Sequence, residues 1–246
     1  MNFPSDREAR ELICSIGHRM SDKGYVSAND GNMSIRVGEN TAYITPTGIN
    51  KGELTPDMLL KIDFDGNILE NPRDMRPTSE TRLHMNCYKT NDALMSTCHT
   101  HSQNAMIWAC AGISLDVAFG PEPQGTIGKV PVAPYGCPGS LALSESVKPF
   151  TKDYKCCLLA NHGAMSWGYS PKEAWYVMEA LDAYAKLCMQ MRLLQLTPRL
   201  LSEEQIEEVV ELCKPTCMTA ANRMVGGKEI VNLQPGLNLS ELLNLK

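Results

Sequence analysis

The stretch that decides the fold of this chain reads Ala93-Leu94-Met95-Ser96-Thr97-Cys98-His99-Thr100-His101-Ser102. Residues 93 to about 98 are predicted as a strand, which delivers the chain to His99. Ser102 can then cap a helix over residues 103–111, because its hydroxyl can accept a hydrogen bond from a free amide of the first turn. The stretch therefore predicts a strand followed by a helix, with two histidines at the junction.

The residues before this stretch predict a helix, a group of strands and a second helix. Ser5-Asp6-Arg7-Glu8 has the pattern of a capping box, and apolar residues recur at helical spacing until Gly24, where a helix would stop. A helix is also predicted after Thr78, through Glu80 to about Tyr88. Short β-like runs separated by Gly, Asn and Pro predict strands between these helices, at residues 33–37, 42–45 and 59–62.

The residues after the stretch continue this alternation. Two strands are predicted at residues 130–133 and 156–160, with a helix over residues 140–150 between them. Ser170-Pro171-Lys172-Glu173 is a capping box with proline at the first helical position. It predicts a long helix whose apolar positions continue to about Leu196.

The last fifty residues have a weaker pattern. Pro198 is predicted to end the long helix, and Ser202-Glu203-Glu204-Gln205 predicts a shorter one. No internal repeat, low-complexity stretch or linker interrupts the alternation of strands and helices. Residues 1–246 are therefore predicted to form a single layered α/β domain, with residues 197–246 as a C-terminal extension of undefined packing.

Composition argues against two classes of partner. The 246 residues carry 28 acidic and 23 basic side chains, a net charge of −5, with no basic block, so we expect no nucleic-acid partner. The longest apolar runs are only a few residues, whereas about 20 are needed to cross a bilayer, so we expect no membrane partner. The first residues do not resemble a secretion leader, and we expect the protein to stay in the cytoplasm.

The ten cysteines are scattered through the chain. Neither close pair, Cys156-Cys157 or Cys213 with Cys217, has the spacing of a structural zinc site. We interpret all of them as reduced thiols, most of them small buried side chains.

Three of the five histidines suggest a metal site. His99-Thr100-His101 follows a predicted strand, and on extended backbone residues two apart project to the same side, so both imidazoles can reach one ion. His162 follows the predicted strand at residues 156–160 and precedes a turn-forming glycine. Three neutral imidazoles with one open position are the arrangement of a catalytic zinc site.

A lone His-x-His is more often a hydrogen-bonded pair, so this interpretation depends on the joint pattern. The third histidine and Glu80, at the start of the helix before the strand, together favour a metal. Imidazole-rich sites suit zinc or a neighbouring transition ion better than magnesium or calcium. Glu80 and His84 are one helical turn apart, but the H-E-x-x-H pattern is missing, so we interpret His84 as packing or capping and His18 as structural.

Six motifs, in order between Asp30 and Gly163 and within the stretch from residue 5 to about residue 196 over which the resemblance extends, complete this constellation. They are Asp30-Gly31-Asn32-Met33-Ser34, Ile44-Thr45-Pro46-Thr47-Gly48, Thr78-Ser79-Glu80, His99-Thr100-His101, Val132-Ala133-Pro134-Tyr135 and Ala160-Asn161-His162-Gly163. With these motifs the sequence resembles the class II aldolase/adducin family, and specifically its zinc-dependent fuculose-1-phosphate aldolase branch.

The resemblance implies a three-layer α/β/α domain around a mixed, mostly antiparallel sheet. It also implies a homotetramer with active sites at subunit boundaries. Residues matching His99, His101 and His162 hold one Zn²⁺ per subunit in such enzymes, although another divalent transition metal is possible. The residue matching Glu80 ligates the metal in the resting state and serves as the acid/base.

The reaction implied is the cleavage of a ketose 1-phosphate, such as a fuculose or 5-deoxypentulose phosphate, to dihydroxyacetone phosphate and an aldehyde. Zinc would stabilise the enediolate that this cleavage leaves. The family's phosphate cradle uses backbone amides and hydroxyls rather than a basic cluster. The matching residues are Gly31, Asn32, Thr47, Gly48, Thr78 and Ser79, and the Gly31 and Gly48 segments are also ordinary turn sequences.

One family feature is missing. The fuculose branch protonates the leaving aldehyde oxygen with a tyrosine of a neighbouring subunit, but the equivalent residues 118–125 contain no tyrosine. Their single carboxylate, Glu122, is the candidate for a second acid/base group, and an exposed loop glutamate is the alternative interpretation.

Three other activities stay open. The epimerases of the family usually have aspartate where Glu80 stands, so the glutamate favours an aldolase. Methylthioribulose-1-phosphate dehydratase shares the zinc histidines and a glutamate in the loop of Glu122. A non-catalytic adducin-like interaction module shares the fold without a working metal site.

Overall fold

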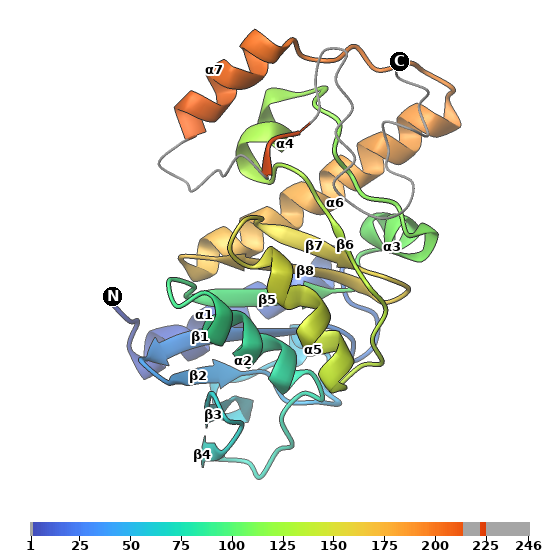
Figure 1. Ribbon diagram of the computed structural model, residues 1–246. Helices are drawn as coiled ribbons and strands as arrows, with labels where there is room; N and C mark the ends of the chain where they lie inside the picture. The colour runs from blue at the N-terminus through green and yellow to red at the C-terminus, as the bar shows by residue number, and fades with distance from the viewer. Residues whose placement is uncertain (1, 214–221, 225–246) are drawn as a thin grey trace.

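The computed structural model describes residues 2–213 and 222–224, and its centre is one sheet. This 8-stranded sheet has the order β4-β3-β2-β1-β5-β8-β7-β6 (Figure 1). Its strands are β1 (Asn32–Gly38), β2 (Thr41–Ile44), β3 (Leu60–Asp63), β4 (Ile68–Glu70), β5 (Ser96–Thr100), β6 (Val132–Ala133), β7 (Cys156–Leu159) and β8 (Gly163–Gly168). All neighbours pair antiparallel except β6 and β7, which are parallel. The predicted mixed, mostly antiparallel sheet is confirmed.

Helices cover both faces of this sheet (Figure 1). One face carries α2 (Thr81–Thr90) and α5 (Leu141–Val147), and the other carries α1 (Asp6–Asp22), α3 (Gln103–Ala111) and α6 (Pro171–Leu193). Because side chains alternate along a strand, Cys156 and Leu158 pack with α6 while Cys157 and Leu159 pack with α2 and α5. Two buried cores therefore sandwich the sheet, which confirms the three-layer α/β/α class.

Three of the four predicted N-caps form, at Ser5, Ser170 and Ser202, and the one at Ser102 does not. The Ser5 hydroxyl and the Glu8 carboxylate complete both halves of the capping box of α1. The Ser170 hydroxyl accepts from the Glu173 amide at the start of α6. Ser102 stands at the predicted N-cap of α3, but its hydroxyl makes no capping hydrogen bond and is buried without a partner in the described structure.

The long helix α6 ends earlier than predicted. It stops at Leu193, before Pro198, and Gln195 has a positive φ of 54°. Leu193 and Leu194 are 73% and 67% exposed, so these apolar side chains are not buried against another element of the described chain. An apolar spacing without burial does not extend a helix.

Other boundaries differ from the prediction as well. The strand predicted at residues 93 to 98 runs from Ser96 to Thr100, so His99 lies inside β5 rather than after it. The strand predicted at residues 130–133 is reduced to the two residues of β6. Among the strands and α-helices, three were not predicted, and they are β4, β8 and α4 (Pro121–Thr126).

At one end of the sheet, α4 packs against α7 (Glu203–Cys213), beside α6 (Figure 1). The Ser202 capping box of α7 forms as predicted. Of the predicted extension, residues 197–213 and 222–224 are described, and the rest lies outside the described residues. Every described cysteine is a free thiol, and within the described residues no helix is long and apolar enough to span a membrane.

Candidate metal centre

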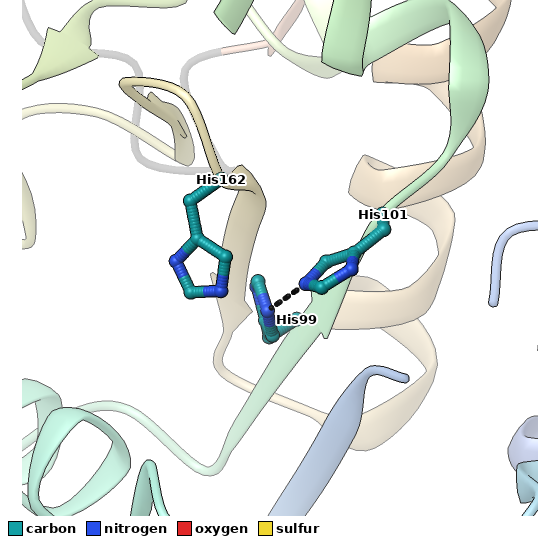
Figure 2. Close-up of side chains that lie close together, drawn as sticks. All are labelled: His99, His101 and His162. Atoms are coloured by element: carbon teal, nitrogen blue, oxygen red, sulfur yellow. Dashed lines mark hydrogen bonds between the residues drawn. The ribbon is translucent and has the colours of Figure 1, made fainter. Parts of the chain in front are cut away.

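The pairing of β5 with β8 brings the three histidines together. His99 is the fourth residue of β5 and His101 follows the strand, so both project to the same side of the extended chain. His162 lies in the turn between β7 and β8, and β8 begins beside the end of β5, with Thr100 opposite Ala164. Figure 2 shows the three rings turned toward a common point.

The distances between the rings suit a shared ion. One ligand nitrogen from each of His99, His101 and His162 lies within 4.8 Å of the others. The Nε2 atoms of His99 and His101 are 3.0 Å apart (Figure 2). Tetrahedral zinc with Zn–N bonds near 2.0–2.1 Å holds two nitrogens about 3.4 Å apart. The cluster is therefore compact enough for its three nitrogens to bind one metal ion.

Contacts on the far side of two rings fix which nitrogen faces the cluster. His99 donates from Nδ1 to the Ala164 carbonyl at 2.9 Å, and His101 Nδ1 lies 3.2 Å from an Asp30 carboxylate oxygen. With each Nδ1 protonated, both Nε2 atoms present lone pairs to each other. Two facing lone pairs repel unless a cation lies between them, and such second contacts are typical of metal-binding histidines.

Glu80 places a carboxylate beside the three rings. It occupies the N-cap position of α2 without capping the helix, and its side chain is buried beside the rings. Oε2 lies 3.2 Å from His99 Nε2, and Oε1 lies 3.4 Å from His162 Nε2. In the described structure Oε1 has no hydrogen-bond partner, although it is fully buried. A buried carboxylate oxygen facing an imidazole lone pair fits a bound cation.

Burial also keeps the rings in the form that binds metals. Desolvation, followed by the neighbouring His101 and His162, holds the pKa of His99 well below its usual value. Desolvation likewise lowers the pKa of His162. Neutral imidazole is the ligand form, so His99 and His162 can both act as ligands at neutral pH.

The structure brings the three segments of the predicted phosphate cradle next to this centre. Asn32 is paired with His99 across β1 and β5, and the Thr78 amide donates to the Thr45 carbonyl at 3.2 Å. Gly31 has a φ of 70°, and a Cβ there would come within 2.9 Å of the His99 carbonyl oxygen. Gly48, Thr47, Thr78 and Ser79 lie on these adjoining segments. The Asn32 amide, however, already donates to Glu80 at 2.8 Å.

Lys51 is a basic group that sequence reasoning did not single out. Its side chain is buried, and Nζ donates to the carbonyls of Asn29 at 2.9 Å and Ile49 at 2.6 Å. Burial lowers its pKa to about 8. It ties the segment before Gly31 to the segment after Gly48. Neither Lys51 nor Asp30 has a spacing relative to the histidines that a sequence pattern could reveal.

The remaining candidates lie away from the cluster. Glu122 is exposed in the first turn of α4, and within the described residues no hydrogen bond or ion pair joins it to the histidines or to Glu80. His18 is exposed on α1. His84, interpreted from the sequence as packing or capping, is fully buried, and its Nε2 is hydrogen-bonded to Asn32 Oδ1.

Comparisons with known proteins agree with this geometry. The model of a family described as the class II aldolase and adducin N-terminal domain matches residues 11–189. A 3-oxo-tetronate 4-phosphate decarboxylase of Pectobacterium atrosepticum is 32% identical over 190 residues, covering 76% of this chain and 86% of that protein. An L-fuculose phosphate aldolase of Methanococcus maripaludis is 34% identical over 172 residues, covering 70% and 91%.

Solved structures share the fold. YgbL of Klebsiella pneumoniae has a TM-score of 0.77 at 27% identity, over 84% of this chain and 99% of that one. An L-fuculose 1-phosphate aldolase has a TM-score of 0.78 at 24% identity, over 86% and 98%.

Proposed function

Because the chain belongs to the class II aldolase and adducin family, we propose that it is a metal-dependent enzyme that cleaves a ketose 1-phosphate. The products are dihydroxyacetone phosphate and an aldehyde, and the substrate resembles fuculose 1-phosphate or a 5-deoxypentulose 1-phosphate. The observation that carries this proposal is the convergence of three imidazoles and the buried Glu80 on one point. An interaction module of the same fold has no need of that arrangement.

His99, His101 and His162 would hold the ion, with Glu80 as the further ligand of the resting enzyme. This nitrogen-rich set favours Zn²⁺, one per subunit, over the hard ions magnesium and calcium, and other divalent transition ions suit it too. When bound, such an ion polarises the substrate carbonyl and stabilises the negative charge that develops during cleavage.

Glu80 supplies the proton chemistry. Breaking the carbon–carbon bond leaves an electron pair on the three-carbon fragment, and a proton must be delivered to that carbon. Glu80 lies within 3.4 Å of two of the imidazoles, those of His99 and His162, so it would lie beside the reacting atoms of a substrate bound at the cluster. Its burial excludes water as a competing proton donor.

The phosphate would bind on the adjoining segments of the cradle. Gly31 and Gly48 allow close backbone approach, while Thr47, Thr78 and Ser79 offer amides and hydroxyls. Lys51 supports the proposal because it joins two of these segments and places a buried cation behind them.

Decarboxylation is the second candidate, because relatives named for it match as well as the aldolases do. Loss of CO₂ from a 3-oxo-tetronate 4-phosphate breaks a carbon–carbon bond next to a ketone. It leaves the same three-carbon phosphate fragment as the aldol cleavage. Only the aldol cleavage needs a group that exchanges a proton with the leaving oxygen, and Glu122 is the candidate for that role. Both reactions yield dihydroxyacetone phosphate, so this product does not distinguish them. The other product does, because it is an aldehyde in the aldol cleavage and CO₂ in the decarboxylation.

We also propose that the enzyme is a homotetramer with sites at subunit boundaries. The exposed apolar side chains of Leu193, Leu194 and Leu212, between 67% and 80% accessible, support further burial in an assembly. Light scattering of the full chain would measure the mass, and a monomer would contradict the proposal.

The test of function uses the full chain, freed of metal by a chelator and reloaded with Zn²⁺, Mn²⁺ or Mg²⁺. A panel of ketose 1-phosphates and a 3-oxo acid 4-phosphate is assayed for dihydroxyacetone phosphate, aldehyde and CO₂. Water release alone would identify a dehydratase, and inversion without cleavage an epimerase. We expect aldehyde release to require a transition ion. His99→Ala and His162→Ala should abolish it, whereas the exposed His18→Ala should not. Activity in both cluster variants would contradict the metal mechanism.

A further inference from the structure

A buried hydrogen-bonded network lies behind Glu80, between α2 and the sheet. Its members come from α2, β1 and β5, and each is at most 5% exposed. This His84 network consists of Asn32, Ser34, His84, Tyr88 and Thr97. None of the five is a member of the histidine cluster, yet the network reaches the cluster through Asn32.

The bonds of the His84 network run in one line toward Glu80. The Asn32 amide nitrogen lies 2.8 Å from Glu80 Oε2, and its Oδ1 is hydrogen-bonded to His84 Nε2. On the other side of the ring, His84 Nδ1 lies 2.6 Å from the Thr97 hydroxyl and 3.0 Å from the Ser34 hydroxyl. The Tyr88 hydroxyl, 2.7 Å from Ser34 Oγ, closes the network.

The charge of Glu80 fixes the direction of the bonds from Glu80 through Asn32 to His84. A carboxylate only accepts hydrogen bonds, so Asn32 must turn its NH₂ group toward Glu80. Asn32 Oδ1 then faces His84, and the Nε2 atom there must carry a proton to donate. His84 Nδ1 is left as an acceptor, which a hydroxyl of Thr97 or Ser34 satisfies. Burial, which lowers the pKa of His84 to about 3, is consistent with this single-proton ring.

We propose that His84 is a positioning residue: by holding the Asn32 amide, it keeps the Glu80 carboxylate turned toward the three histidines. The His84 ring is hydrogen-bonded to none of the three histidines, and it reaches the Glu80 carboxylate only through Asn32, which is also a residue of the predicted phosphate cradle. The inference rests on the proposed role of Glu80 as metal ligand and acid/base.

A filler of the core would behave differently from a positioning residue. Filling needs only volume, whereas positioning needs a donor at the place of Nε2. Glutamine puts its amide nitrogen near the place of a histidine Nε2, and asparagine puts its own near Nδ1. His84→Gln can therefore keep the bond to Asn32, while His84→Asn keeps a polar group but loses that bond. Both variants retain some polarity in the network, which protects folding.

The experiment compares these two variants in the full chain, with His18→Asn as the matched exposed control. Melting temperature, the Zn²⁺ dissociation constant from competition with a chromophoric chelator, and kcat and KM are measured. We expect His84→Asn to weaken Zn²⁺ binding and lower kcat by about 10- to 100-fold, the range for supporting partners of metal ligands. His84→Gln should recover about tenfold of that loss, with KM little changed.

A double-mutant cycle shows whether the effect passes through Asn32. In an Asn32→Ala background, His84→Asn should cost less than about threefold, because the link is already absent. Equal losses in both backgrounds would overturn the proposal, as would equal defects in folded His84→Gln and His84→Asn. If the native protein cleaves no substrate of the panel, the proposed function fails. The Zn²⁺ constants then still decide whether His84 positions Glu80.

Discussion

Glu80 and Glu122 are the two carboxylates proposed for acid/base roles, and their surroundings are opposite. Glu80 is 4% exposed, receives a hydrogen bond from Asn32 and lies within 3.4 Å of two imidazoles. Glu122 is exposed in the first turn of the short helix α4. Electrostatic interactions are strong where water is excluded and weak where it has access. Any role of Glu80 should therefore depend on its own carboxylate. A role of Glu122 should depend on whether a partner subunit buries its carboxylate.

The largest effect is expected for Glu80→Gln. Glutamine has nearly the same shape but cannot exchange a proton, so kcat should fall by about 10²- to 10⁴-fold, the usual contribution of a general acid or base. Rapid mixing of the Zn²⁺-loaded variant with substrate measures the loss. An unchanged melting temperature would exclude misfolding as the cause. A loss below about threefold would remove Glu80 from the proton chemistry.

The second effect is the pH dependence of stability that the buried His84, behind Glu80, is expected to cause. The pKa of His84 is about 3 in the folded chain because of desolvation, against 6.5 when unfolded. The unfolded chain therefore binds a proton more readily. The stability that the neutral ring contributes is complete above pH 6.5 and is lost as the pH falls toward 3. His84→Gln should flatten the acid side of the stability curve by up to about 1.4 kcal/mol per pH unit.

Urea unfolding of the metal-free proteins between pH 7 and pH 4 measures this difference. Glu80 and His99 are the charged and titrating groups that face His84 in the folded chain, and both are kept in the variant. Parallel curves for the two proteins would show that His84 is not protonated on unfolding in this range.

Asp30 is intermediate between the two glutamates, with its side chain 42% exposed and 3.2 Å from His101. Asp30→Asn keeps the shape but weakens the hold on the His101 Nδ1 proton. Loss of such a partner costs about 10- to 100-fold in metal affinity, and exposure to water places this case near tenfold. A competition titration with Zn²⁺ measures it. The exposed Asp65→Asn is the control, and an unchanged constant for Asp30→Asn would mean that His101 needs no support.

The sequence indicated which histidines belong to the site more clearly than how the fold brings them together. His99 and His101 could be placed on one side because extended backbone has a period of two, and His162 because it follows an apolar strand. That the three meet depends on β8, which was not predicted. Its residues Gly163–Gly168 include only four between two glycines, too few to predict a strand, and they are held as one by β5 and β7 on either side.

The supporting contacts were beyond sequence reasoning for a related reason. The pairs of Asp30 with His101 and of Asn32 with Glu80 and His84 link segments that only the folded sheet brings together. No periodicity encodes which rotamer or amide orientation a buried polar side chain adopts. Helix starts, in contrast, are local: the Ser5 and Ser202 capping boxes form as predicted from four residues each.

The smallest effect is expected for Glu122→Gln. An exposed carboxyl is surrounded by water, which can also exchange protons with a leaving oxygen, so kcat for aldehyde release should fall less than about tenfold. Release of CO₂ from a 3-oxo acid phosphate should not change, because that leaving group needs no proton. Measuring both products with one variant therefore tests the role and the reaction together. A loss of 100-fold or more confined to aldehyde release would contradict the expectation. It would mean that a neighbouring subunit buries Glu122 against the reacting oxygen, and the site would then lie at a subunit boundary. Dilution of the enzyme to monomers should in that case lower aldehyde release by a similar factor.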